Sequence, residues 1–342
     1  MPRRRPNSST RSTKQKTLLG CFAVIVVTYL AMIRRLLSSQ PMDLSINSLP
    51  ISIPPLDDLV QGWNITGNVS WLMDFSIIAF PKTGTSTLMF YLEQYKDSIF
   101  IFPDERCELG WNQHVKLIRA MYRKYHPQRR MGIKCPRDLE IHLSMTNYNK
   151  FFPTTKFIVG LRHPVLWFES FYNFRVTNEY PMPPPENLIG RCAKANHGLC
   201  TFRANFSKHL QNIEPWRPVF LYHVDQLRED QDGPRFRKDL GDYLHVFRPL
   251  TLPMIWVKPG QTNLTLEKQK EIDSLKMDIC QERYTNLRQV LMAQGTTSAK
   301  WIEDVFLLQS NVVVSNHERF VQLLNSWHSD PCEQRNTNIT II

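Results

Sequence analysis

The chain has 342 residues, of which 42% are hydrophobic and 21% are charged. This balance excludes wholesale disorder, and the length suffices for one large core or two modest ones. The formal net charge is +11, but six of the basic residues precede residue 17, so the rest of the chain has only a modest basic excess. Such an excess fits an anionic ligand or a solvated basic surface.

The first apolar stretch runs from Thr17 to Ile33 without a charge, and Arg34 and Arg35 follow it. At about 1.5 Å per residue, a helix here spans roughly 25 Å, slightly less than a typical hydrocarbon core. A cleaved signal peptide would have a shorter apolar region and a small-x-small cleavage site, which is not seen before Arg34. Because basic residues are denser before the stretch, we predict a cytosolic tail (1–16), a signal-anchor helix (17–33) and a single-pass type II membrane protein.

Two further features favour a lumenal body. N-x-S/T acceptor sequences for N-glycosylation occur at Asn64, Asn68, Asn205, Asn263 and Asn338. An even set of six cysteines follows the anchor: Cys107, Cys135, Cys192, Cys200, Cys280 and Cys332. These predict disulfide bonds, with Cys192–Cys200 as the most local pair and buried free thiols as the alternative. The proline-containing segment 34–70 shows no sustained periodicity and predicts a lumenal stem.

A compact domain (71–335) is predicted after the stem. Its buried-strand candidates are short apolar runs at Phe75–Phe80, Lys156–Leu161 and Pro218–Val224. Each run leads towards a helical pattern, which predicts an α/β domain with a central parallel β-sheet flanked by helices. Consecutive prolines make Tyr180–Leu188 an irregular loop. The region from Thr265 is predicted to be helical, with a stop at Gly295.

The turn after the first strand has the composition of an anion site. Its candidate ligand-binding residues are Lys82, Thr83, Gly84, Thr85, Ser86 and Thr87. Open α/β sheets bind ligands at the carboxyl ends of their strands, where a glycine allows close backbone approach and helix amides point at an anion. The turn matches neither G-x-x-x-x-G-K-[ST] nor G-x-G-x-x-G. A helix start capped by serine or threonine is the alternative interpretation.

The second strand–helix junction repeats this arrangement. Arg162 follows a strand, Pro164 marks a helix start, and Ser170 lies eight residues beyond Arg162. A guanidinium fork and a hydroxyl two turns into the helix can together bind one phosphate. Taken singly, each side chain is equally consistent with a solvent-facing position.

Taken together, Pro-Lys-x-Gly-Thr after a strand and Arg-x-Pro with a serine eight residues past the arginine resemble the sulfotransferases that use 3′-phosphoadenosine 5′-phosphosulfate (PAPS). The segment "VFLYHVDQLRED" is similar to the strand and acidic turn that follow in these enzymes. The resemblance extends over roughly residues 75–242 and, with the anchor, is closest in layout to Golgi type II carbohydrate sulfotransferases. It implies a P-loop-like domain, PAPS as donor and a carbohydrate hydroxyl or amine as acceptor. It also implies a Golgi membrane location with a lumenal catalytic domain.

The resemblance also implies how the donor is held. In this family the first turn binds the 5′-phosphosulfate, and the pair matching Arg162 and Ser170 binds the 3′-phosphate. Lys82 is then expected to neutralise the charge that develops on the leaving phosphate. No metal is expected to take part, because positioning and electrostatics supply the catalysis in related transfers.

The catalytic base is left open by the sequence. Similar Golgi enzymes place a glutamate in the region "SIFIFPDERCELGW", which makes Glu105 the first candidate and Glu108 the second. Cytosolic members use a histidine, so His114 is a third candidate. Lys134, in "GIKCPRDL", resembles a Lys-x-Pro element near the acceptor and is expected to orient the base or the substrate. Solvated surface side chains are the alternative for each of these residues.

Two other functions compete with this interpretation. A Golgi glycosyltransferase would share the anchor and stem, and Asp230-Gln231-Asp232 matches the metal-binding Asp-x-Asp of many such enzymes. This triplet explains neither Lys82 nor the pair of Arg162 and Ser170. A lumenal nucleotide-binding protein without catalysis is the other alternative. A lumenal location argues against nucleic acid as a partner. No motif in the sequence identifies the acceptor.

Overall fold

The computed structural model describes residues 53–178, 180, 183, 205–228, 230–256 and 265–333. The predicted cytosolic tail, the predicted membrane anchor and the first part of the predicted stem lie outside the described residues. Within the described ranges, no helix is long and apolar enough to cross a membrane. All the elements given below belong to one compact unit that begins at Pro54.

Six strands of the described chain form one parallel sheet in the order β4-β5-β3-β6-β7-β8. They are β3 (Phe75–Ile77), β4 (Ile99–Ile101), β5 (Arg130–Lys134), β6 (Lys156–Leu161), β7 (Val219–His223) and β8 (Val312–Val314). The predicted α/β fold with a central parallel sheet is therefore confirmed. The three strands expected from the sequence are β3, β6 and β7, whereas β4, β5 and β8 were not predicted.

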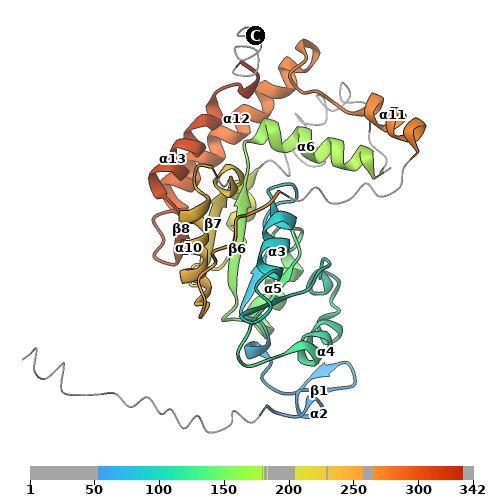
Figure 1. Ribbon diagram of the computed structural model, residues 1–342, viewed down its shortest axis with the longest axis vertical. Coiled ribbons are helices and arrows are strands. Elements are labelled where there is room, and N and C mark those ends of the chain that lie inside the picture. The colour runs from blue at the N-terminus through green and yellow to red at the C-terminus, as the bar shows by residue number, and fades with distance from the viewer. Residues whose placement is uncertain are drawn as a thin grey trace, which may run out of the picture. The chain divides into compact units, whose positions relative to one another are not determined.

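Helices connect the strands and surround the sheet. The α-helices are α2 (Leu56–Leu59), α3 (Thr85–Glu93), α4 (His114–Lys124), α5 (His142–Phe151), α6 (Pro164–Thr177), α9 (Phe206–Leu210), α10 (Gly233–Leu244), α11 (Leu266–Leu275), α12 (Thr285–Trp301) and α13 (His317–Asn325). Shorter helical turns are η1 (Ser70–Leu72), η2 (Glu108–Trp111), η3 (Asp138–Glu140), η5 (Val224–Leu227), η6 (Glu282–Tyr284), η7 (Ile302–Phe306) and η8 (Ser326–His328). In Figure 1, β6 leads directly into α6, which crosses the end of the sheet.

The two faces of the sheet are covered by different helices. Helices α3 and α10 bury Leu88, Phe236 and Leu240 against one face. Helices α4, α5, α9, α12 and α13 cover the other face, where Tyr148 and Phe320 are buried. Because both faces are covered, the strands are apolar runs rather than alternating ones, as expected for a parallel sheet.

Residues 54–70, which the sequence assigns to the stem, pack against α4. They contain α2 and a short antiparallel hairpin of β1 (Val60–Gln61) and β2 (Asn64–Ile65). Leu59 and Val69 are buried in the core beside α4. Arg119 of α4 donates a hydrogen bond to the carbonyl of Gly62 at 2.8 Å. This part of the segment is therefore folded onto the domain.

The predicted helix stop at Gly295 is wrong. Helix α12 continues through Gly295 to Trp301. A Cβ atom at this position would lie 2.5 Å from Cγ of Pro164, so the glycine allows α12 to pack against the start of α6. The glycine that suggested a helix end in the sequence instead marks a contact between two helices.

Two disulfide bonds join segments that are distant in sequence. One links Cys107 to Cys135, and the other links Cys280 to Cys332. The prediction of disulfides is confirmed for these four cysteines. The local pair that the sequence favoured, Cys192 with Cys200, lies outside the described residues.

Candidate active site

The sheet order changes direction between β3 and β6. From β3 the chain moves to β4 and β5 on one side, and then returns to β6 on the other side. Such a switch point is where open α/β sheets bind ligands, outside the carboxyl ends of the strands. The two sequence motifs are the segments that leave β3 and β6, so the fold brings Lys82 and Arg162 to this place.

The turn after β3 is held by side chains from three other positions. Trp167 Nε1 of α6 donates to the carbonyl of Pro81 at 2.8 Å, and Arg162 Nη1 donates to the carbonyl of Lys82 at 3.3 Å. The hydroxyl of Tyr222 on β7 donates to the carbonyl of Thr83 at 3.1 Å. Trp167 and Tyr222 were not predicted from the sequence. Their contacts with this turn are tertiary and leave no local motif.

The backbone of the turn has two residues with positive φ. Lys82 has φ of 68° and Gly84 has φ of 85°. A non-glycine residue with positive φ is uncommon and is found preferentially at functional sites. Gly84 is also closely packed, since a Cβ atom there would lie 2.5 Å from Cδ1 of Leu227. The first turn of α3 begins directly after Gly84.

The hydroxyl-bearing residues of the turn have different surroundings. Thr83 is fully buried and donates its hydroxyl to the carbonyl of Phe80 at 2.6 Å. Thr85 and Thr87 on α3 are also buried, at 5% and 2% exposure. Ser86 is more open and accepts a hydrogen bond from Lys134 Nζ at 2.9 Å. Of these hydroxyls, Ser86 is therefore the best placed for a ligand.

The ammonium of Lys82 lies in a cationic and partly buried environment. Burial lowers the pKa of Lys82 most, and the charges of Arg162 and Lys134 lower this pKa further. The Lys82 ammonium also lies 4.6 Å from the ring centroid of Phe174 on α6. Phe174 was not predicted from the sequence, although it lies four residues after Ser170 and therefore on the same side of the helix.

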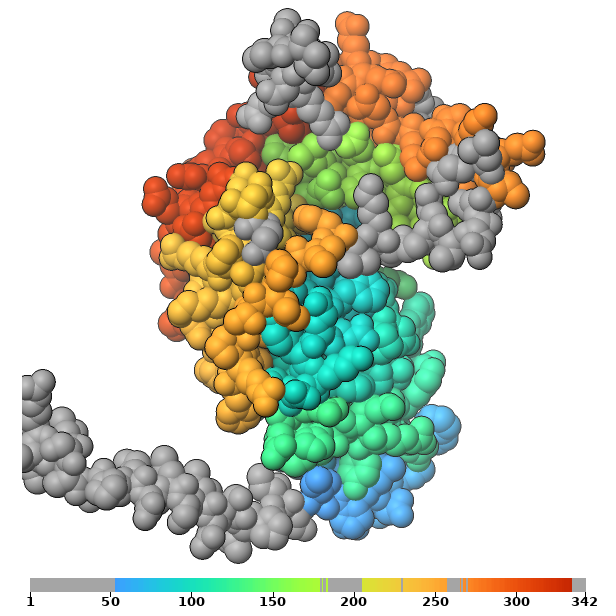
Figure 2. Space-filling model, in the orientation of Figure 1, coloured from blue at the N-terminus to red at the C-terminus, as the bar shows by residue number. Residues whose placement is uncertain are grey.

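Arg162 and Ser170 are positioned by the start of α6. Arg162 directly follows β6. Ser170 is the seventh residue of α6 and is partly exposed. His163 caps this helix, because its Nδ1 accepts a hydrogen bond from the amide of Val165 at 3.3 Å. Figure 2 shows the surface of α3 below that of α6. Ser170 belongs to the second of these helices.

Lys134 joins the end of β5 to two candidate residues. Its side chain is only 4% exposed, and its Nζ lies 2.9 Å from Ser86 Oγ and 3.2 Å from Glu105 Oε1. The side chain of Glu105 is 51% exposed, so its carboxylate is accessible from solvent. Lys134 thus orients Glu105 beside the turn that carries Lys82.

Glu108 lies in a different environment from Glu105. Its Oε1 forms an ion pair with Arg106 at 2.6 Å, and the residue is 7% exposed. Its Oε2 is buried without a hydrogen-bond partner among the described residues. The carboxylate of Asp138 is close enough for the charge of Glu108 to raise the pKa of Asp138. Glu108 is therefore buried in the protein, with Arg106 as its partner.

His114 is separated from this group of side chains. Its ring stacks on Phe151 at a centroid distance of 4.6 Å. Burial and the charge of Lys150 lower the pKa of His114. The structure therefore gives His114 a packing role between α4 and α5.

The Asp-x-Asp triplet is also accounted for by local contacts. Asp232 Oδ1 accepts a hydrogen bond from Asn316 at 2.9 Å, and Asp232 Oδ2 lies 3.6 Å from Arg319. Across the described ranges, no three or more His, Cys, Asp or Glu side chains are grouped as metal ligands. The triplet thus anchors the start of α10 to α13.

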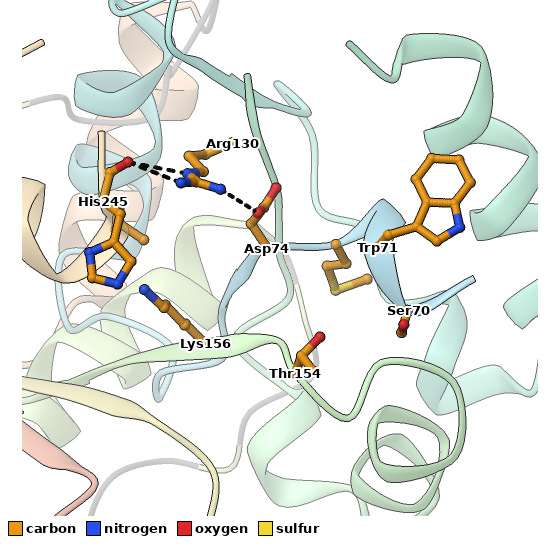
Figure 3. A pocket seen from close by; sticks show the side chains of 9 residues that line it. Ser70, Trp71, Asp74, Arg130, Thr154, Lys156 and His245 are labelled. Carbon is orange, nitrogen blue, oxygen red and sulfur yellow. Dashed lines mark hydrogen bonds and ion pairs between the residues drawn. The ribbon is translucent and has the colours of Figure 1, made fainter. Parts of the chain in front are cut away.

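A cavity of about 190 Å³ lies at the opposite, amino edge of the sheet. Its charged lining includes Asp74, Arg130 and Lys156, which lie at the starts of β3, β5 and β6 (Figure 3). Arg130 donates to Asp74 and to the carbonyl of His245, and Lys156 donates to the carbonyl of Tyr243. These two cations therefore cap the carboxyl end of α10. We interpret this cavity as a structural charge cluster.

The chain was compared with family models, with curated proteins and with solved structures. No family model matches the chain, and no curated protein matches it. The chain is similar to the crystal structure of a sulfotransferase from Alicyclobacillus acidocaldarius, with a TM-score of 0.47 and 15% sequence identity. The match covers 68% of this chain and 96% of that chain.

Proposed function

We propose that this chain is a PAPS-dependent sulfotransferase, which transfers a sulfuryl group to a hydroxyl or amine of a carbohydrate acceptor. The observation that carries the proposal is the grouping of Lys82, Arg162 and Lys134 at the switch point, with Glu105 paired to Lys134. Burial lowers the pKa of Lys82 most, and the charges of Arg162 and Lys134 lower it further, so the three cations repel one another there. A polyanion such as PAPS would relieve this repulsion.

In the proposed reaction, the side chains have separate tasks. The Glu105 carboxylate accepts the proton of the acceptor hydroxyl, and the acceptor oxygen then bonds to sulfur. The bond between sulfur and the bridging oxygen of the donor breaks, and 3′,5′-adenosine bisphosphate leaves. Lys82 neutralises the charge that develops on the leaving phosphate, an interaction that strengthens in the transition state.

The remaining residues of the site bind and orient. Arg162 and Ser170 are proposed to hold the 3′-phosphate, through the guanidinium fork and the hydroxyl. Ser86 and the amides at the start of α3 are proposed to hold the 5′-phosphosulfate. Lys134 fixes the Glu105 carboxylate by its ion pair and keeps it beside the turn.

The proposal is tested first by ligand-dependent thermal melting. The purified chain is melted with and without 3′,5′-adenosine bisphosphate, beside Lys82→Met, Arg162→Met and the exposed control Arg123→Met. A ligand at one hundred times its Kd adds about 2.7 kcal/mol to the free energy of unfolding. We expect the parent and Arg123→Met to shift by a few degrees and the other two variants to lose the shift. A folded parent that does not respond at saturating ligand would overturn the proposal.

Turnover separates catalysis from binding alone. With labelled PAPS and a panel of glycans, we expect labelled glycan to form both with and without a chelator. Nucleotide binding without transfer to any acceptor would favour the non-catalytic alternative. Manganese-dependent transfer from a sugar nucleotide would favour the glycosyltransferase instead.

We also propose that the chain is a type II protein of the Golgi membrane with its folded unit in the lumen. The support is the apolar stretch 17–33, the denser basic residues before it and the acceptor sequences for glycosylation after it. Asn64 is exposed on β2 and is suited to carry a glycan. Protease protection of the folded unit in intact vesicles, with a mass change on glycosidase treatment that Asn64→Gln reduces, tests this topology. Digestion without detergent would contradict it.

A further inference from the structure

The ring of Phe174 lies against the ammonium of Lys82. The centroid of the ring is 4.6 Å from Lys82 Nζ, well within the range of a cation–π contact. Phe174 and Ser170 are four residues apart on α6, so their side chains leave the same side of the helix. The contact therefore joins the turn after β3 to the side of α6 that carries Ser170.

The surroundings of Lys82 disfavour its positive charge. Burial lowers the pKa of Lys82, and so do the charges of Arg162 at the end of β6 and Lys134 at the end of β5. The carboxylate of Glu105 is paired with Lys134. Among the described residues no carboxylate forms an ion pair with Lys82. The face of an aromatic ring is thus the group in contact that favours the charged ammonium.

We propose that Phe174 is a positioning residue for Lys82: the ring of Phe174 holds the Lys82 ammonium in place beside the turn, in its charged form. The kinetic consequence of this inference rests on the proposed function, whereas the contact between ring and ammonium does not. A carboxylate in place of the ring would hold the lysine more strongly, but it would also repel an anionic donor. The ring carries no net charge, so it orients Lys82 without opposing the ligand.

The contact itself is tested by titrating Lys82 without any substrate. NMR spectra of isotope-labelled lysines are followed against pH, and the signal of Lys82 is identified by its loss in Lys82→Met. In Phe174→Leu, which removes the ring face but keeps an apolar side chain, we expect the Lys82 midpoint to move to lower pH. In Phe174→Trp, whose ring binds cations best, the midpoint should stay at or above that of the parent.

A matched control is available elsewhere on the surface. Phe247 is 80% exposed and lies 5.9 Å from the guanidinium of Arg130 at the amino edge of the sheet. Phe247→Leu removes the same kind of contact away from the turn, so the Lys82 midpoint should not change. If Phe174→Leu is not folded by circular dichroism, Phe174→Met serves in its place. An unchanged Lys82 midpoint in a folded ring-deleted variant would overturn the inference.

Activity gives a second, independent readout. We expect kcat for sulfuryl transfer to fall about two- to thirtyfold in Phe174→Leu and to recover in Phe174→Trp. KM for the acceptor should change little, because the ring acts through Lys82. A moved midpoint in a chain that transfers no sulfuryl group would leave the inference standing and remove the proposed function. A normal rate in Phe174→Leu, with nucleotide binding intact, would remove the positioning role alone.

Discussion

The ammonium of Lys134 lies 2.9 Å from the hydroxyl of Ser86, although the two residues are 48 positions apart. This contact ties the end of β5 to the first turn of α3. Because the same ammonium is 3.2 Å from Glu105, it also fixes a carboxylate beside the turn that carries Lys82. This relationship is the reason why we propose Glu105 as the base, among the three candidates that the sequence left open.

The first prediction concerns that base. Glu105→Gln should lower kcat by about 10²–10⁴-fold. The melting shift by 3′,5′-adenosine bisphosphate should be retained, because Glu105 lies beside the turn that carries Lys82 rather than in it. Steady-state kinetics and melting on the same samples check both parts. Asp104→Asn, the exposed neighbour, is the control and should be active.

Glu108→Gln should instead lower stability, because it leaves Arg106 without its buried partner. A greater loss of kcat in folded Glu108→Gln than in Glu105→Gln would contradict the assignment.

The sequence alone could not distinguish Glu105 from Glu108 as the candidate base. Only Arg106 and Cys107 lie between them, so both belong to the short segment that connects β4 to α4. What distinguishes them is the partner of each, Lys134 for one and Arg106 for the other. These pairings follow from how the loop packs on the end of β5, which no local pattern records. The turn that carries Lys82, in contrast, could be located from sequence because strand, turn and helix are contiguous.

The same distinction applies to the strands. The predicted strands β3, β6 and β7 lie in mainly apolar runs that extend over Phe75–Phe80, Lys156–Leu161 and Pro218–Val224. Strand β5 was missed because Gly132 and its charged ends weaken the pattern. A Cβ atom at Gly132 would lie 2.1 Å from the ring of Phe75 on β3. The ring of Phe75 therefore occupies the space that a side chain at position 132 would fill, and this is a tertiary contact that the local sequence does not show.

A second prediction concerns the backbone of the turn. Gly84→Ala should lower the free energy of unfolding by about 2–4 kcal/mol, through positive φ and overpacking against Leu227. Gly62→Ala is the matched control, because Gly62 also has positive φ but a Cβ atom there would meet nothing within 4 Å. It should cost only the backbone part, about 1 kcal/mol. Denaturant unfolding of both variants measures the difference, and equal losses would show that Leu227 yields without cost.

A third prediction concerns the disulfide bonds. The bonded cysteines are 28 residues apart in Cys107–Cys135 and 52 apart in Cys280–Cys332. Replacing either pair by serine should lower the free energy of unfolding by about 3–4 kcal/mol. Only the first pair ties the loop of Glu105 to the strand end that carries Lys134. At a temperature where both variants are folded, kcat should fall more in the variant without Cys107–Cys135. Equal rates in the two variants would show that the loop holds its position without the bond.

The fourth prediction concerns the pH dependence of stability, on which the buried side chains of Asp138 and His223 have opposite effects. Burial raises the pKa of Asp138 from 3.8 to about 7, despite hydrogen bonds from Ser144 and Tyr148. Burial lowers the pKa of His223 from 6.5 to about 4. Between pH 4 and 6.5 the folded chain therefore holds a proton on Asp138 that the unfolded chain has lost. The unfolded chain holds a proton on His223 that the folded chain has lost.

These two differences have opposite signs in the pH dependence of stability. Asp138 makes the free energy of unfolding fall as pH rises, by up to about 1.4 kcal/mol per pH unit, and His223 makes it rise at a similar rate. In the parent the two effects largely cancel over this range. Relative to the parent, Asp138→Asn should therefore gain stability as pH rises from 4 to 6.5, and His223→Gln should lose stability.

Denaturant unfolding of the parent and both variants at closely spaced pH values measures these slopes. The mean stability of each variant is not informative, because both substitutions also change buried hydrogen bonds: His223 Nδ1 accepts from the amide of Asp225, and Asp138 Oδ2 accepts from Tyr148. The asparagine amide can donate to Tyr148 as a protonated Asp138 would, so Asp138→Asn reproduces the uncharged state. If both variants keep the slope of the parent between pH 4 and 6.5, Asp138 and His223 titrate alike in the folded and unfolded chains, and burial does not control their charges.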